Sequence, residues 1–383
     1  MEQLADRLYR NDGTGRFTRD PTALPAEFRE NGGAVAVGDF DGDRDPDLFV
    51  GSRVVARAYG RVPRSWLLRN DGSGHFRDVT DAMAPGLARA GMVTGASFMD
   101  ATGDGRLDLV VAGEWMPVQL WVNTGGRLIE EGATRGFADS QGWWNSLQVA
   151  DLTGDGLPDL VLGNAGRNGY LRASPSHPVR MHVHDFTATG TTKGIITRFV
   201  GDTSYPVAGR DDLVKLMPAL RPRFPSYTAF GAVRLEALFD AAEREAAAVL
   251  EARTLASAVA INDGSGRFRL VELPWEAQVS TVFASLVLDM NRDGNADLLL
   301  GGNRYGVPPL FGRADASRGV TLLGDGRGGF RPAPRAQAIP LEGQIRGLAW
   351  VRTPRSDSLL VVARSGSSLQ MLQRLRVPSP PKR

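Results

Sequence analysis

The chain contains no cysteine, which excludes disulfide scaffolds, thiolate metal sites and a cysteine nucleophile. No apolar run approaches the roughly 18 residues that a membrane-spanning helix needs. The opening segment, MEQLADRLYR, lacks the apolar core of a signal peptide. Because a repeat element begins at Tyr9, almost at once, we expect that upstream domains of a longer parent chain precede this sequence.

The common catalytic motifs are also missing. The sequence has no G-x-S-x-G elbow, no P-loop, no H-E-x-x-H and no dinucleotide fingerprint. Its basic residues are dispersed rather than clustered with aromatic residues, which argues against a nucleic-acid partner. We therefore expect a non-enzymatic binding module. The alternative is a glycan-active enzyme such as a polysaccharide lyase, which would need acid–base residues that converge at the centre of the fold.

The chain contains four copies of a short acidic loop, and an apolar strand follows each copy. Every copy carries oxygen-bearing side chains at positions 1, 3, 5 and 9, an arrangement that suits a hard cation such as Ca²⁺. Magnesium fits less well because it prefers smaller octahedral sites with several waters. The copies are Asp39–Leu48, Asp100–Leu109, Asp151–Leu160 and Asp289–Leu298.

We predict about four Ca²⁺ sites, each using these side chains and the backbone carbonyl at position 7. The alternative is a set of Asx turns that need no metal. Glycine at position 6 permits the sharp turn in three copies, and Arg44 replaces it in the first. The predicted ligands are Asp39, Asp41, Asp43, Asp45 and Asp47; Asp100, Thr102, Asp104, Arg106 and Asp108; Asp151, Thr153, Asp155, Leu157 and Asp159; and Asp289, Asn291, Asp293, Asn295 and Asp297.

A fifth copy departs from the pattern. Asp185, Thr187 and Thr189 stand at positions 1, 3 and 5, but Lys193 stands at position 9. An ammonium group there can take the place of the ion and pair with Asp185. We predict that this loop holds no metal.

A second repeat indicates the fold. Asn-Asp-Gly turns and their variants at Tyr9–Phe17, Leu68–Phe76, Val122–Leu128, Ile261–Phe268 and Leu323–Phe330 are typical of hairpins. A strand, an acidic loop, a second strand and such a hairpin make one four-stranded antiparallel blade. First strands near Ala34, Thr94, Ser146, Met181, Val282 and Gln344 predict an all-β, six- or seven-bladed β-propeller.

The predicted propeller is one domain over residues 1–377, followed by a disordered tail at 378–383. A half-blade at residues 4–20 closes the ring by completing the last blade (Ile345–Leu375), or else belongs to a seventh blade. A helical insertion is expected at residues 210–256, within the fifth blade. Its main helix is Ala232–Ala252, which is rich in helix formers with apolar residues at helical spacing.

The loops resemble the FG-GAP/VCBS repeats of integrin-α-like β-propellers. The segment GWWNSLQVADLTGDGLPDLVLGN (Gly142–Asn164) and the other repeat segments resemble bacterial VCBS-repeat proteins along nearly the whole chain. The resemblance implies a calcium-binding propeller in an exported or surface-attached protein that serves in binding or adhesion. It also implies an extracytoplasmic location and a glycan or protein ligand. Lys193 and Arg44 depart from the family pattern.

Charge suggests that the ligand is acidic. Positions 1, 3, 5 and 9 of the four loops hold 13 of the 43 acidic residues, so a net charge of +2 conceals a basic remainder. Codon bias is the plainer explanation, because the bases are nearly all arginine and only Lys193, Lys215 and Lys382 are lysines.

Single residues offer further candidates. Trp143–Trp144 and Tyr305 suit sugar stacking, although inter-blade packing is as good an explanation for the tryptophans. His182 and His184 alternate in a strand and could bind zinc, but a plain strand pair is favoured. The run Arg210, Asp211 and Asp212 is more typical of a helix start than of an acid–base pair.

Overall fold

The computed structural model describes residues 6–28, 32–187, 189–308, 311–352 and 358–373. The predicted tail at 378–383 and the first two residues of the predicted half-blade lie outside these ranges. None of the described helices is long and apolar enough to cross a bilayer. The chain is all-β, with every pair of neighbouring strands antiparallel.

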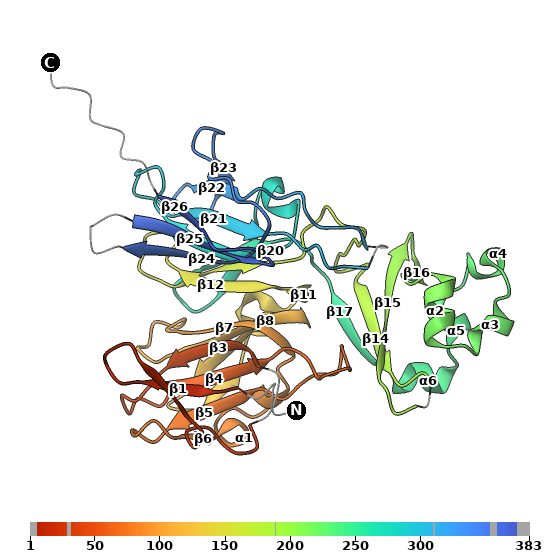
Figure 1. Cartoon of the computed structure of the whole chain (residues 1–383), viewed down its shortest axis with the longest axis horizontal. Coiled ribbons are helices and arrows are strands. Elements are labelled where there is room, and N and C mark those ends of the chain that lie inside the picture. The colour runs from red at the N-terminus through yellow and green to blue at the C-terminus, as the bar shows by residue number, and fades with distance from the viewer. Residues whose placement is uncertain (1–5, 29–31, 188, 309–310, 353–357, 374–383) are drawn as a thin grey trace.

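Four described sheets repeat one arrangement, in which an inner strand enters an acidic loop and returns as the second strand (Figure 1). A further sheet keeps the first three strands. The bounds are β3 (Gly32–Gly38), β4 (Asp47–Ser52), β5 (Trp66–Asn70) and β6 (Phe76–Asp78); β7 (Met92–Met99), β8 (Asp108–Met116), β9 (Gln119–Asn123) and β10 (Leu128–Glu130), with β11 (Gly142–Trp143) beside β8; β12 (Ser146–Ala150), β13 (Asp159–Gly163), β18 (Ala258–Asn262) and β19 (Phe268–Glu272); β20 (Val282–Leu288), β21 (Asp297–Gly302), β22 (Val320–Gly324) and β23 (Phe330–Pro332); and β24 (Gln344–Arg352), β25 (Ser358–Ser365) and β26 (Gln370–Gln373).

The sheets stack face to face, as the blades of a propeller do. The inner strands β3, β7, β12, β20 and β24 follow one another as neighbours. Val110 and Leu160, on the second strands of adjacent sheets, share one core, and Leu299 shares another with Ile345. Because both faces of a second strand are covered, the apolar runs after the acidic loops are buried along their length.

The predicted hairpins are confirmed. The turns join β5 to β6, β9 to β10, β18 to β19 and β22 to β23, and a fifth joins β1 (Leu8–Asn11) to β2 (Phe17–Asp20). Within the described residues β1 and β2 pair only with each other. Arg10 of β1 donates hydrogen bonds to the carbonyls of Ser73 (3.2 Å) and Gly74 (3.0 Å), in the turn of the first sheet. The hairpin therefore contacts the first sheet, and its predicted place, in the last blade or in a seventh one, stays a prediction.

The predicted blade start at Met181 is wrong. Met181 lies on β14 (Val179–His184), in a separate sheet with β15 (Lys193–Val200), β16 (Thr203–Pro206) and β17 (Ala248–Ala252). This sheet and its helices stand to one side of the stacked sheets in Figure 1. Since β13 pairs directly with β18, the insertion spans residues 164–257 of the third sheet, not 210–256 of a fifth blade. Strand alternation alone did not show which sheet the strand joins.

The predicted long helix at Ala232–Ala252 is also wrong. It divides into α5 (Leu235–Leu238), α6 (Ala241–Ala246) and the strand β17. Asp240 interrupts the helix by capping α6 in a reciprocal capping box with Glu243. Leu250 then pairs with Met181 in the sheet, so tertiary pairing prevails over helix propensity. The remaining helical elements are α1 (Thr80–Met83), α2 (Arg210–Leu216), α3 (Leu220–Arg223), α4 (Tyr227–Phe230) and the single turns η2 (Leu87–Arg89), η3 (Ala133–Phe137) and η4 (Trp275–Gln278).

Candidate metal loops and an arginine-lined cavity

The aspartate at position 1 organises each of the four acidic loops. Asp151 accepts backbone hydrogen bonds from Gly154 (2.6 Å) and Gly156 (2.9 Å). The equivalent bonds recur on Asp39, Asp100 and Asp289. Position 6 has positive φ in every copy, including 76° at Arg44. The first loop thus keeps the shared geometry although its arginine replaces glycine.

Position 5 holds position 7 in the same way in all four loops. The backbone N–H at position 7 donates to the carboxylate at position 5, as Leu157 does to Asp155 at 2.9 Å. The same bond joins Asp45 to Asp43, Arg106 to Asp104 and Asn295 to Asp293. The predicted ligands at positions 5 and 7 therefore lie side by side in each loop.

The aspartate at position 9 is completely buried in all four loops. Asp108 accepts N–H bonds from Ala101 (3.0 Å) in the loop and from Asn123 (2.7 Å) at the end of β9. Asp159 makes the same pair of bonds with Leu152 and Asn262. These carboxylates fasten the loop to the outer hairpin of their own sheet, a role that the sequence reasoning missed. The sequence did contain a signal for this role, because each of these aspartates directly precedes an apolar strand that is buried along nearly its whole length.

Burial changes the acidity of the position-9 group. It raises the pKa of Asp47 to about 6 against two opposing backbone hydrogen bonds, and the nearby Asp41 and Asp43 charges raise it further. Burial likewise raises the pKa of Asp108 and Asp159. A desolvated carboxylate close to other carboxylates favours a nearby cation.

Position 3 provides the most direct test of whether a cation fits. The Oγ1 atoms of Thr102 and Thr153 are buried and have no hydrogen-bond partner. Buried hydroxyls nearly always find a partner, because an unpaired one costs about 1–3 kcal/mol. Both orphaned oxygens stand at the predicted ligand position of their loops, so this donor set fits a calcium ion.

The first loop has the densest negative charge. Ligand atoms of Asp39, Asp41 and Asp43 lie within 4.8 Å of one another, the only such group of three found in the described ranges. Arg69 of β5 pairs with Asp41 (2.6 Å) and Asp43 (3.2 Å). The guanidinium therefore balances part of the negative charge of this loop.

The fifth loop differs from the other four at position 3. Thr187 Oγ1 donates to Asp185 (3.1 Å) and bonds Thr189 Oγ1 (2.8 Å), so no buried oxygen is left without a partner there. Lys193 lies at the start of β15 opposite His184, and it forms no ion pair with Asp185 in the described structure. The predicted pairing is therefore not confirmed, and the absence of metal stays a prediction.

A cavity of about 440 Å³ lies at the opposite ends of the inner strands. Its lining comes from all five stacked sheets, including Gly33 of the first and Arg346 of the last. Arg53, Arg304 and Arg346 line it, and no carboxylate is among the lining residues. We call it the axial cavity.

A second cavity, of about 320 Å³, continues from the first because Asn145 and Arg304 line both. Its wall includes Trp143 and Tyr170, next to the inserted sheet. The two tryptophans predicted as stacking residues therefore have different surroundings. Trp143 lines a cavity, whereas Trp144 is fully buried and donates its Nε1 to Ser140 O at 2.9 Å.

Other candidates from the sequence acquire plain structural roles. Tyr305 carries the Arg313 guanidinium over its ring at 4.3 Å, outside the two cavities' linings. His182 contacts Thr197 Oγ1 at 3.3 Å, and neither strand histidine belongs to a three-ligand group in the described residues. Arg210, Asp211 and Asp212 form the first turn of α2, as the helix-start interpretation predicted.

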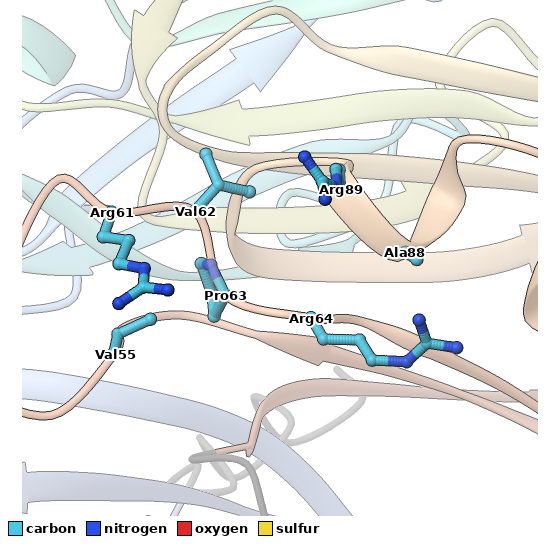
Figure 2. A pocket seen from close by; sticks show the side chains of 7 residues that line it. All are labelled: Val55, Arg61, Val62, Pro63, Arg64, Ala88 and Arg89. Carbon is cyan, nitrogen blue, oxygen red and sulfur yellow. The ribbon is translucent and has the colours of Figure 1, made fainter. Parts of the chain in front are cut away.

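A further basic cleft, of about 560 Å³, lies by the loop after β4 (Figure 2). Arg61, Arg64 and Arg89 line it, but Figure 2 shows their guanidinium groups well apart. Arg64 is already paired with Asp78 (2.9 Å) and Asp81 (3.0 Å). This cleft is basic without being a convergent site.

The comparisons agree with the repeat pattern. The model of the FG-GAP-like repeat matches residues 3–50, 54–111 and 100–162. Residues 3–162 therefore carry FG-GAP-like repeats. The matched stretches contain the first three acidic loops, and the fourth loop repeats their pattern and hydrogen bonds.

No curated protein matches the chain significantly. Among solved structures, it is similar to the V. cholerae biofilm matrix protein Bap1, with 11% identity over 87% of this chain and 66% of that one, and a TM-score of 0.32. It is also similar to BBS1N in complex with ARL6DN, with 10% identity over 97% and 86% of the two chains and a TM-score of 0.35. This chain thus spans just under two thirds of Bap1 and most of BBS1N.

Proposed function

We propose that this chain is a calcium-stabilised, propeller-like binding module. The observation that carries the proposal is the pair of buried, unpaired hydroxyl oxygens of Thr102 and Thr153 at the same position of two equivalent acidic loops. Hydroxyl, carboxylate and carbonyl oxygens are the ligands that Ca²⁺ takes in proteins.

Each loop would hold the ion with the side chains at positions 1, 3, 5 and 9 and the carbonyl at position 7. In the third loop these are Asp151, Thr153, Asp155, the carbonyl of Leu157, and Asp159. The bound cation would supply positive charge to carboxylates that the fold has desolvated. Because it binds the folded loop, it stabilises the protein, by about 2.7 kcal/mol for a site at a hundredfold excess over its Kd.

The decisive experiment replaces the orphaned hydroxyls with an isosteric methyl group in Thr102→Val and Thr153→Val. In chelator, neither substitution should lower the free energy of unfolding, because the hydroxyl has no protein partner to lose. In calcium, each should weaken the stabilisation, with a tenfold loss of affinity worth about 1.4 kcal/mol per site. Thermal and urea unfolding with calcium and with chelator measure both.

Thr187→Val is the matched control, since its hydroxyl is already bonded within the fifth loop. It should cost the same stability with and without calcium. Equal stability of the wild-type protein in calcium and in chelator would overturn the proposal.

The binding role rests on the repeat family, whose domains are commonly binding or adhesion modules, and the predicted ligand is a glycan or a protein. The proposal places the protein outside the cytoplasm, where calcium is abundant enough to fill weak sites. We also propose that the stacked sheets are the blades of a closed propeller, because residues of the first and the last sheet line one cavity. The enzyme alternative gains no support from Tyr59, a phenol that lines the second cavity, because burial and the Glu114 carboxylate raise the pKa of its hydroxyl. A tyrosine held protonated is a poor general base.

A further inference from the structure

The axial cavity contains two positive charges that no protein carboxylate balances. Arg53 is paired with the buried Glu114, whose Oε1 lies 2.6 Å from its Nη2. Arg304 and Arg346 form no ion pair in the described residues, and the lining of the cavity contains no Asp or Glu. Burial and the neighbouring Arg304 charge lower the pKa of Arg346. An anion bound between the two guanidinium groups would relieve that repulsion.

Both arginines are held in place by contacts that leave donors available. Arg346 lies over the Phe283 ring at 4.0 Å and donates Nη1 to the carbonyls of Asn303 (3.0 Å) and Ile345 (2.7 Å). Its Nη2 donates to Gln344 Oε1 (3.3 Å), which leaves Nε and the second Nη2 hydrogen available. Arg304 lies 5.7 Å from the Trp143 ring centroid, and its side chain makes no hydrogen bond in the described structure. Guanidinium groups positioned in advance bind a planar carboxylate through two parallel hydrogen bonds.

The backbone beside Arg304 is unusually constrained. Asn303 is buried with φ of 78°, a left-handed conformation that is uncommon outside glycine. Its side chain donates to the carbonyls of Ser317 (2.8 Å) and Gly343 (3.0 Å) and accepts from Ser280. Arg304 itself forms a two-way backbone bridge with Ala314. These bonds fix the backbone that presents Arg304 to the cavity.

The adjoining aromatic wall indicates what kind of anion fits. Trp143 borders Arg304, and its Nε1 is buried with no hydrogen-bond partner. Tyr59 and Tyr170 line the same continuation of the cavity. A cavity of about 440 Å³ is far larger than a single small anion requires. A ring with an apolar face and hydroxyl groups would use the aromatic surface and the unpaired donor.

We propose that the axial cavity and the second cavity that continues from it bind a carboxylate-bearing sugar unit of an acidic glycan. Arg304 and Arg346 would take the carboxylate, and Trp143, in the second cavity, would contact the ring. This deepens the proposed binding role but does not depend on the calcium loops, which lie at the other ends of the strands.

The test is isothermal titration of the whole chain with hexagalacturonate, in calcium kept in excess so that the acidic sugar cannot strip the loops. Maltohexaose is the neutral probe and inorganic phosphate the simple-anion probe. Hexagalacturonate should bind, maltohexaose should not, and phosphate should bind at least tenfold more weakly. Arg304→Gln and Arg346→Gln should each weaken hexagalacturonate binding ten- to a hundredfold, as expected for charge-assisted hydrogen bonds.

Arg89→Gln, in the cleft of Figure 2, is the matched control and should leave the affinity unchanged. An equal loss in this variant would show diffuse attraction to a basic surface and overturn the proposal. Absence of hexagalacturonate binding, or phosphate binding with equal affinity, would overturn it as well.

Unfolding temperatures identify any variant that fails to fold, and Arg304→Lys then tests the same contact with the charge retained. If calcium proves not to stabilise the protein while hexagalacturonate still binds, the calcium proposal fails and this one stands.

Discussion

The two ends of the inner strands carry opposite chemistry. At one end, four acidic loops concentrate carboxylates, with a fully buried aspartate in each. At the other end, the axial cavity gathers arginines and no carboxylate. Each acidic loop belongs to a single sheet and the loop is repeated, whereas the axial cavity takes one to three residues from each of five sheets and their loops. The repeated end therefore suits a structural role, and the composite end suits recognition of one ligand.

The largest expected effect would come from removing a buried aspartate of the acidic end. Asp108→Ala leaves the N–H groups of Ala101 and Asn123 without their acceptor. We expect a loss of roughly 2–4 kcal/mol in the free energy of unfolding, in chelator as well as in calcium. Urea unfolding measures it. A loss confined to calcium would show that this carboxylate acts only as a ligand and not as the fastener of loop to hairpin.

The pH dependence of the calcium-free protein should be the next largest effect. The pKa of Asp47 is about 6 in the folded protein against an ordinary 3.8, so the folded state retains this proton longer than the unfolded chain does. The associated stability is complete below about pH 4 and is lost as the pH rises through about 6, by on the order of 1–3 kcal/mol.

Unfolding in chelator at pH 5 and pH 7 measures this loss, with Asp47→Asn as the comparison. The wild-type protein should lose stability between the two pH values, and the variant should lose less. Calcium should reduce the wild-type loss, because a bound cation favours the ionised carboxylate. A wild-type protein that gains stability over this range in chelator would contradict the assignment to Asp47.

The same contrast explains what could be predicted from the sequence. The acidic loops and hairpins are local, so spacing alone predicted their strands, their turns and the common position of Thr102 and Thr153. The insertion was misplaced because the pairing of Leu160 with Ala260 joins residues about a hundred positions apart, which no local pattern records. The convergence of Arg53, Arg304 and Arg346 depends on how separate sheets stack. Among the residues that line the two cavities, Trp143 is the one that the sequence marked as a candidate for ligand stacking, as one of a pair of adjacent tryptophans.

The smallest effect is expected in the fifth loop, Asp185–Lys193, which resembles the four acidic loops but lies in the insertion. Asp185 accepts backbone bonds from Thr189 (3.2 Å) and Gly190 (2.5 Å), so the turn is formed by the protein's own donors. Its position-9 residue is a lysine, and the position-3 hydroxyl is already paired. Asp185→Ala should therefore change the calcium-induced increase in unfolding free energy by less than about 0.5 kcal/mol. Measuring that increase for Asp185→Ala beside Asp151→Ala tests whether repeat geometry alone suffices for an ion. A crystal structure with a cation coordinated by Asp185 and Thr189 would show that it does, and that a lysine at position 9 and a paired hydroxyl at position 3 do not exclude the ion.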